Sequence, residues 1–323
     1  MRRLRGILFI LVLILCLLPA FSDSIKTIRI KKIGTSPNFI ALSPDGTKLY
    51  ATSYGTDELL RISLDKKAIT GSILVGSAPL GLAIADEGKT ALVACKDSST
   101  IAVVDLVNFK TVADIKVGGL PNFVAMSPRG YRAYVTNYGR TKEGLLHIVD
   151  VRERSVVSTI KMGISPFALA VSPTTEMVYV VMGGENEVWV VDPEQQKVVD
   201  KIAVGEAPDG IAITPDGKRV FVANGGSNDL SVIDTELKRV QVTVPVGKNP
   251  FTVAVSPDGK RVFVVNPASR NVSILPTDLT SLDPVTLDVD RGPTDIKIAP
   301  DNRTIYVINE LSNSLLIADI PPE

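Results

Sequence analysis

Few side chains in this sequence are of the types that carry out chemistry in pairs or triads. The chain has one histidine, His147, and two cysteines, Cys16 and Cys95. A cysteine nucleophile needs a neighbouring base, and His147 lies in no motif that would make it the partner of Cys95. Zinc is usually held by several His or Cys ligands, which these residues do not supply. We therefore predict no catalytic residue and no metal site.

Motifs for other chemistries are also absent from the sequence. It has no Cys-x-x-Cys-His for haem attachment, no Gly-x-Ser-x-Gly elbow and no glycine-rich phosphate loop. A carboxylate-bound Ca²⁺ stays open as an alternative, although no EF-hand signature supports it. We predict no cofactor, and a His-dependent hydrolase or lyase is disfavoured.

The elements that would position any site recur at a nearly constant interval. Seven prolines, separated by 42, 42, 45, 42, 42 and 43 residues, mark the repeat: Pro37, Pro79, Pro121, Pro166, Pro208, Pro250 and Pro293. A β-rich unit of about 40–45 residues has the size of one propeller blade. A residue shared by most repeats therefore builds blades, and only residues that differ between repeats can carry a particular function.

The fifth repeat shows how each unit folds. A short apolar run follows Pro208, and a Pro215-Asp216-Gly217 turn separates it from a second β-branched run that ends at Asn224. Runs over 230–235 and 240–246 supply a third and a fourth strand. Four antiparallel strands in each of seven repeats predict an all-β, seven-bladed propeller. A sandwich is disfavoured because two stacked sheets need no fixed period.

The two ends of the chain complete the ring. The last repeat stops after its third strand, residues 315–320, while residues 24–33 form an unassigned strand before the first repeat. We predict that this N-terminal strand closes the seventh blade as its outer strand, which leaves no open edge at the closure. Residues 23–323 are then one propeller domain.

The first 22 residues have the order of a secretory signal peptide. Arg2, Arg3 and Arg5 precede an apolar run over 6–18, and Ala20 and Ser22 place small residues before a cleavage site at Asp23. An uncleaved anchor is the weaker alternative because the run is short for a membrane span. A lipoprotein at Cys16 is weaker still. We expect an extracytoplasmic protein, with no stable membrane span after cleavage.

Removal of that segment changes the charge and the cysteine count. The 35 basic and 35 acidic residues become 32 against 35, a formal charge of −3. No polybasic stripe is visible, so nucleic acid is not an expected partner. Cys95 is left alone and cannot form an internal disulfide.

The second strand and its exit carry a family resemblance. Repeat three reads Ala133-Tyr134-Val135-Thr136-Asn137, and related segments end at Asn224, Asn266 and Asn309. Together with Val-Gly-x-x-Pro and Ser-Pro-Asp-Gly, this pattern resembles the YVTN family of β-propeller repeats over roughly residues 24–320. The resemblance implies the fold. It also permits several roles, since such propellers serve as binding platforms, surface-layer modules and portions of redox enzymes.

Several conspicuous residues are expected to be structural. The Asn that ends the second strand can bond the backbone of the following turn. Cys95 replaces it in repeat two, and a buried, unreactive thiol is the expected result. His147 stands where other repeats place unrelated residues, so variable packing between blades is expected.

On one rim of the propeller, the residues differ between repeats and are therefore candidates for a particular function. The loops from fourth to first strand and from second to third strand share a face of a propeller, and the residues after each proline lie there. Four repeats carry Phe at this place: Phe39, Phe123, Phe167 and Phe251. The side chains of Asn38, Asn122 and Asp209 add hydrogen-bonding groups. Packing between blades and a platform for a ligand or partner are the two interpretations.

Two further departures from the repeat belong to this candidate site. The fourth residue after the proline is Ala in six repeats but Lys297 in the seventh, with Asp295 two residues earlier. An unpaired buried charge is costly, so an Asp295–Lys297 pair is expected, with contact to a ligand anion as the alternative. A three-residue insertion in repeat three displays Arg140 and Lys142 on a rim loop.

The sequence favours an exported, non-catalytic propeller that binds a protein, glycan or small ligand through one rim. The phenylalanines would supply apolar contacts, and Lys297 the one unusual charge. A lactonase-like hydrolase or a redox-enzyme-associated propeller is the alternative that the family resemblance permits.

Overall fold

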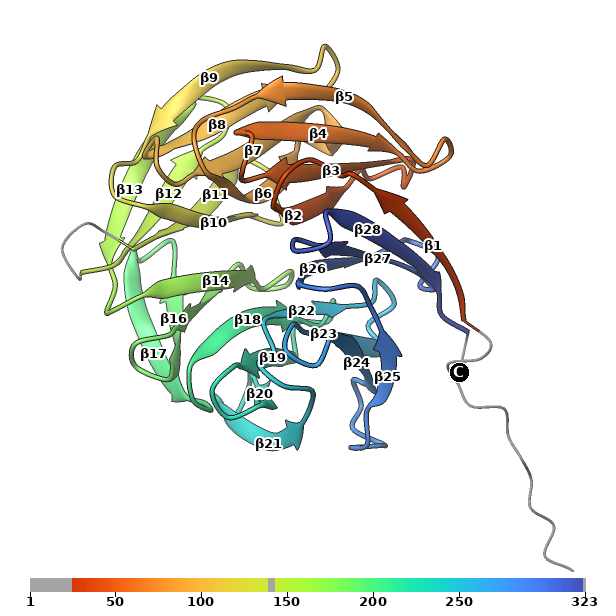
Figure 1. Ribbon diagram of the computed structural model, residues 1–323. Helices are drawn as coiled ribbons and strands as arrows, with labels where there is room; N and C mark the ends of the chain where they lie inside the picture. Colours follow the sequence, from red (N-terminus) through yellow and green to blue (C-terminus); the bar gives the residue numbers. More distant parts are fainter. Residues whose placement is uncertain (1–24, 139–142, 322–323) are drawn as a thin grey trace, which may run out of the picture.

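The computed structural model describes residues 25–138 and 143–321. Its strands form seven four-stranded antiparallel sheets around a central channel (Figure 1). The predicted all-β, seven-bladed propeller with four antiparallel strands per blade is confirmed. The predicted signal peptide over residues 1–22, and Arg140 and Lys142, lie outside the described residues.

Each blade runs from an inner strand at the channel to an outer strand at the circumference. Blade 1 has β2 (Pro37–Leu42), β3 (Lys48–Ser53), β4 (Glu58–Ser63) and β5 (Ala68–Leu74). Blade 2 has β6 (Pro79–Ala85), β7 (Thr90–Cys95), β8 (Thr100–Asp105) and β9 (Lys110–Lys116). Blade 3 has β10 (Pro121–Met126), β11 (Arg132–Asn137), β12 (Leu145–Asp150) and β13 (Ser155–Lys161). Blade 4 has β14 (Pro166–Val171), β15 (Val178–Met182), β16 (Glu187–Asp192) and β17 (Lys197–Ala203).

The remaining blades follow the same order. Blade 5 has β18 (Pro208–Ile213), β19 (Arg219–Asn224), β20 (Asp229–Asp234) and β21 (Arg239–Pro245). Blade 6 has β22 (Thr252–Val255), β23 (Arg261–Asn266), β24 (Asn271–Pro276) and β25 (Val285–Asp288). Blade 7 has β26 (Pro293–Ile298), β27 (Thr304–Asn309), β28 (Ser314–Asp319) and, outermost, β1 (Lys26–Lys31).

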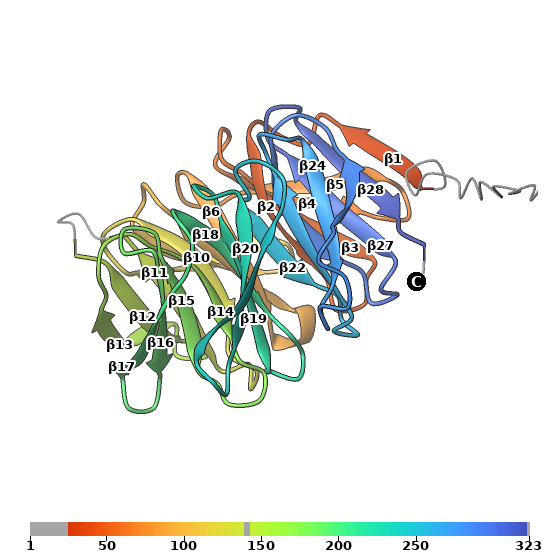
Figure 2. The ribbon, with the colours of Figure 1, turned by 90° about the horizontal axis from the view of Figure 1, so that it is seen from below.

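The chain closes its ring with its own N-terminal strand. β1 pairs antiparallel with β28 from Lys26 opposite Asp319 to Lys31 opposite Ser314. Figure 2 shows the two strands side by side at the edge of the disc. Ile30 and Ile33 pack into the apolar cluster between blades 7 and 1. The predicted closure is confirmed, and it gives every blade an outer strand.

The repeat prolines open the inner strands. In six blades the proline is the first residue of the inner strand and lies opposite the last residue of the second strand, as Pro121 does opposite Asn137. Proline has no N–H, so it fits the first position of a strand. A register shift follows it in each of these blades, which leaves the next two residues outside the regular ladder in five blades and one residue, Thr294, in blade 7. Those residues are the ones that differ between repeats.

Apolar faces of adjacent blades form the core. The second and third strands of each blade bury valine, isoleucine, leucine and alanine side chains on both faces of the sheet. This happens because each blade lies between two neighbouring blades. In blade 2 the regular turn is replaced by a 3-10 turn, η2 (Asp86–Gly88). Among the described residues no helix has the length and apolar character needed to cross a membrane.

Candidate functional site

The four predicted phenylalanines meet one another. The ring centroids of Phe39 and Phe123 are 4.7 Å apart, those of Phe123 and Phe167 5.2 Å, and those of Phe167 and Phe251 5.7 Å. Phe251 returns to Phe39 at 6.5 Å, which completes a cycle. Because the rings come from blades 1, 3, 4 and 6, they can meet only near the channel axis. We call these four residues the phenylalanine cluster, and the end of the channel where they lie the closed end.

The backbone at the closed end is fixed by threonine hydroxyls rather than by the sheet ladder. Thr52 Oγ1 accepts from Phe39 N at 3.1 Å, and Thr136 Oγ1 accepts from Phe123 N at 3.2 Å. Thr294 Oγ1 of blade 7 donates to Asn38 O of blade 1 at 2.7 Å, and Thr252 donates to the Thr294 carbonyl. These bonds satisfy the groups freed by the register shift and link neighbouring inner strands. The site is therefore held by a rigid frame.

Two glycines let the inner strands approach closely here. A Cβ on Gly81 would lie 2.8 Å from Asn122 O, and one on Gly210 would lie 2.3 Å from Phe251 O. Only glycine fits these places without moving the neighbouring backbone. Blades 2 and 5 therefore place glycine where blades 1 and 3 place phenylalanine, and the rings have room to converge.

The predicted polar side chains are sequence neighbours of the phenylalanine cluster on the inner strands or occupy the equivalent position in blade 5. Asn122 is 2% exposed, and its Nδ2 makes no hydrogen bond to any described residue. Asp209 is half-buried, and burial raises the pKa of its carboxyl to about 6. No described residue donates a hydrogen bond to Asp209 or pairs with it. Asn38, which is half-buried in blade 1, completes the predicted set.

Tyr138 connects these groups, and the sequence prediction missed it. Its ring stacks on Phe167 with centroids 6.1 Å apart, and its hydroxyl lies beside the Asn122 side chain. Burial, and then the charge of Asp209, raise the pKa of Tyr138. Tyr138 directly follows Asn137, the last residue of the second strand, so its position on the same rim could have identified it.

The predicted Asp295–Lys297 pair is confirmed. Lys297 Nζ lies 2.9 and 2.8 Å from the two carboxylate oxygens of Asp295 and 3.2 Å from Ile296 O. Asp295 is 2% exposed and also accepts from Ile40 N of blade 1 at 3.0 Å. All three ammonium protons therefore have partners within the chain. The pair joins blades 7 and 1 and leaves little charge for a ligand.

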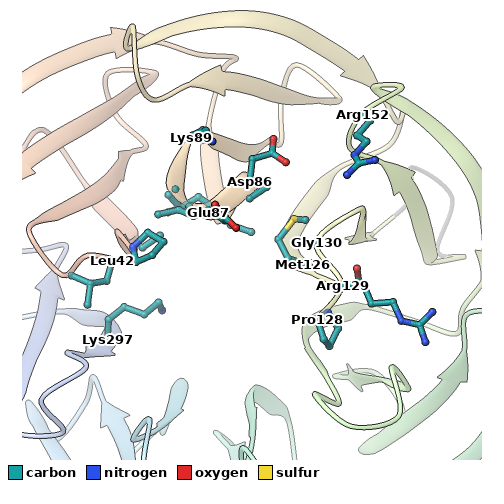
Figure 3. A pocket seen from close by; sticks show the side chains of 18 of the residues that line it. Leu42, Asp86, Glu87, Lys89, Met126, Pro128, Arg129, Gly130, Arg152 and Lys297 are labelled. Carbon is teal, nitrogen blue, oxygen red and sulfur yellow. The ribbon is translucent and has the colours of Figure 1, made fainter.

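The structure separates Lys297 from the phenylalanine cluster, although the prediction placed them on one rim. The Lys297 side chain, 37% exposed, lines a cavity of about 880 Å³ on the opposite face (Figure 3). Turns between first and second strands form its wall, with Pro44, η2 and Arg129. The reason is strand geometry: Lys297 is the fourth residue after its proline and lies below the level of the rings.

The charges around this cavity are mixed. Lys89, Arg129 and Arg152 lie on its rim with Asp86 and Glu87. Arg129 Nε is 3.0 Å from Glu176 Oε1, and the Asp86 carboxylate accepts from Thr90 Oγ1 at 2.9 Å. Lys89 and Arg152 are exposed, and water solvates an exposed charge at no cost. The cavity is large, but its buried ionic groups already have partners.

The residues expected to be structural are buried. Asn137 Oδ1 accepts from Leu120 N at 2.7 Å, and its Nδ2 donates to Gly118 O at 2.7 Å. These partners lie in the loop before Pro121, so Asn137 bonds loop backbone as predicted, but not the backbone of the turn that follows it. Cys95 accepts from Gly76 N and is buried, which confirms the predicted buried thiol, and burial raises the pKa of that thiol to about 11. His147 has its Nε2 3.2 Å from Asn137 Nδ2 and its Nδ1 2.9 Å from Thr159 Oγ1. Burial lowers the pKa of His147 to about 4.

The other strand-end asparagines differ from Asn137 in their partners. Asn224 and Asn266 donate to Ser231 and Ser273 of the third strand, each at 2.9 Å, at the position that His147 holds in blade 3. Within residues 25–138 and 143–321, no group of three or more His, Cys, Asp and Glu side chains is placed to hold a metal ion.

Comparison with known proteins supports the fold. Residues 164–322, which contain blades 4 to 6 and the three inner strands of blade 7, match the model of the YNCE-like beta-propeller family. No curated protein matches the sequence significantly. The YVTN resemblance itself stays a prediction.

Solved structures give the same result over most of the chain. A chain of Kuenenia stuttgartiensis hydrazine synthase superimposes with a TM-score of 0.81 and 23% identity, covering 90% of this chain and 97% of that one. A functionally unknown protein from Desulfotomaculum acetoxidans DSM 771 gives 0.72 and 18%, covering 82% and 90%. At these identities the likeness shows the fold alone. The chain is thus a seven-bladed β-propeller whose residues 164–322 match the YNCE-like propellers.

Proposed function

We propose that this protein is a non-catalytic binding module that takes a small polar ligand at the closed end of its channel. One observation carries the proposal: the Asn122 amide nitrogen is buried without a well-formed hydrogen bond to the described residues, although the Asn122 side chain also interacts with the Tyr138 hydroxyl. Of the buried side-chain atoms in this condition across the described part of the chain, it is the one nitrogen. Leaving such a donor unsatisfied costs about 1–3 kcal/mol, which a ligand acceptor would recover.

The surroundings of Asn122 suit recognition of a small molecule. Aromatic rings of Phe123, Phe167 and Tyr138 supply flat apolar area, and Asp209 adds a polar group on the same side. Sites for small ligands combine apolar walls with a few fixed polar groups in this way. The threonine hydroxyls hold the backbone, so little ordering is needed on binding.

The closed end is favoured over the larger cavity on the opposite face. Lys297 in that cavity is already neutralised by Asp295, and Arg129 by Glu176. The remaining rim charges are exposed and hydrated. At the closed end, by contrast, the buried Asn122 Nδ2 is a donor without a hydrogen bond to the described residues, and a ligand acceptor would change its free energy.

The proposal includes a location outside the cytoplasm. It rests on the charged, apolar and small-residue order of residues 1–22. Expression of the full chain in its host, followed by fractionation and N-terminal sequencing, tests it. A mature N-terminus near Asp23 in an extracytoplasmic fraction supports the location, and an intact Met1 in the cytoplasm contradicts it.

A thermal-shift screen of small metabolites, sugars and short peptides tests the binding function. We expect some of these ligands to raise the melting temperature of the wild type. This rise should disappear in Asn122→Ala, which removes the amide donor. Arg152→Ala, on the opposite cavity, is the matched control and should retain the shift. Loss of binding in Arg152→Ala with retention in a folded Asn122→Ala would move the site to the other face. Turnover of any ligand would replace the non-catalytic role with a hydrolytic or redox one.

A further inference from the structure

We infer that the ligand of the closed end carries a protonated amine, which the Asp209 carboxylate binds between aromatic rings. This inference rests on the proposed function and specifies the chemical class of its ligand. Asp209 is the first residue after the repeat proline of blade 5, and the same position holds Phe167 in blade 4 and Phe251 in blade 6. The carboxylate is therefore flanked on both sides by members of the phenylalanine cluster.

Asp209 lacks the partners that a half-buried carboxylate normally has. Within the described residues it accepts no hydrogen bond and lies in no ion pair. By contrast, Asp295 at the same end of blade 7 accepts from Ile40 N, Ile296 N and Lys297 Nζ. A carboxylate partly removed from water without a cation or donor is destabilising, so an incoming cation has more to gain at Asp209 than at any satisfied acid.

A second acceptor lies next to Asp209. A Cβ on Gly225 would lie 2.9 Å from Asp209 Oδ2 and 3.1 Å from Asn249 Oδ1, so these two oxygens lie near each other beside the Gly225 backbone. An ammonium group has three N–H donors and no acceptor. Two neighbouring oxygens, one of them charged, match that geometry and oppose an anion.

The aromatic rings favour a cation over a neutral donor. The centroids of Phe167 and Phe251 are 5.7 Å apart, and Tyr138 stacks on Phe167. The face of an aromatic ring attracts a cation within about 6 Å, and this attraction increases when water is excluded. Asn122 Nδ2 remains as a donor, so the fitting ligand is a small amine that also carries a hydrogen-bond acceptor, such as a hydroxyl or carbonyl.

Paired probes that differ only in the amine test this inference. Phenethylamine and ethanolamine are compared with 2-phenylethanol and ethylene glycol by isothermal titration and ligand-observed NMR at neutral pH. We expect each amine to bind at least about tenfold more tightly than its neutral partner, a ratio that corresponds to 1.4 kcal/mol. In Asp209→Asn the ratio should fall to near one.

Two alanine variants separate the carboxylate from general effects on the rim. Gly225→Ala places a methyl group 2.9 Å from Asp209 Oδ2 and should weaken amine binding, because the end of that side chain must move. Gly183→Ala, at the same turn position in blade 4, meets nothing closer than 3.6 Å and should leave binding unchanged. Circular dichroism of each variant checks that the fold is intact.

The outcomes distinguish failure of the class from failure of the site. The inference of an amine ligand is wrong if amines and neutral probes bind equally tightly, or if the ratio of their affinities is unchanged in Asp209→Asn. A neutral ligand such as a sugar at the closed end would remain compatible with either result. Tighter binding of an anion such as benzoate also overturns the inference of an amine ligand. If neither these probes nor the metabolite screen gives a ligand whose binding depends on Asn122, the proposed function itself is wrong.

Discussion

Asp209→Asn should make the unliganded protein more stable at neutral pH. Burial raises the pKa of Asp209 from 3.8 to about 6, so the folded state binds its proton more tightly than the unfolded state does. An acid with a raised pKa contributes most stability below its unfolded pKa and loses that contribution as the pH rises through the folded pKa. The uncharged Asn side chain does not titrate and avoids this loss.

The size of the effect follows from the shift. Two pKa units correspond to about 2.7 kcal/mol, since one unit is about 1.4 kcal/mol. Asp209 is only half-buried, and solvent screening reduces this to about 1–2 kcal/mol. Tyr138, the titratable group facing it, stays neutral in this pH range and does not alter the sign.

Urea unfolding of both proteins at pH 4 and pH 7.5 measures the difference. We expect the two free energies of unfolding to be similar at pH 4, and the Asn variant to be more stable by about 1–2 kcal/mol at pH 7.5. Other titrating groups are common to both proteins and cancel. Asp65→Asn, at an exposed turn, controls for the loss of one negative charge. A difference that is the same at both pH values would refute the argument that Asp209 is held unpaired.

Three further predictions follow from buried groups. Lys297→Ala should destabilise the fold by about 1–3 kcal/mol in urea, because Asp295 keeps only backbone donors, and adding Asp295→Asn should recover part of the loss. His147→Gln should remove an acid-sensitive component of stability: the neutral imidazole contributes above pH 6.5, and about 2–3 kcal/mol is lost toward pH 4 in the wild type. Cys95 should resist iodoacetamide at pH 8 in the native protein and react after unfolding, as read by mass spectrometry; rapid native alkylation would contradict its burial.

The fold could be predicted because its signals repeat. Pro37 and its six counterparts open the inner strands, and the Ser-Pro-Asp-Gly turns join first to second strands. Each signal is weak by itself, but seven copies at a nearly constant spacing indicate one architecture, the seven-bladed propeller. The exceptions are local. In blade 6 the inner strand β22 begins only at Thr252, and the outer strand β25 has four residues, Val285–Asp288.

The arrangement of the site could be predicted only in part. Phe39 and Phe123 are second after their prolines, whereas Phe167 and Phe251 are first, so the repeat pattern does not indicate that all four rings meet. Their convergence depends on the direction that the register shift gives each side chain and on the space left by Gly81 and Gly210. The separation of Lys297 from the rings likewise depends on depth along the channel, which differs by about 3 Å per residue.

The equivalent residues of the other blades show whether the fold requires a carboxylate at position 209. The first position after the proline holds Asn38, Leu80, Asn122, Phe167, Asp209, Phe251 and Thr294. All seven belong to blades of the same fold, so the fold does not require an acid there. An unpaired half-buried carboxylate lowers stability at neutral pH, and any of the other six side chains avoids that loss. A carboxylate that the fold neither needs nor satisfies is therefore the feature that the proposed cationic ligand would account for.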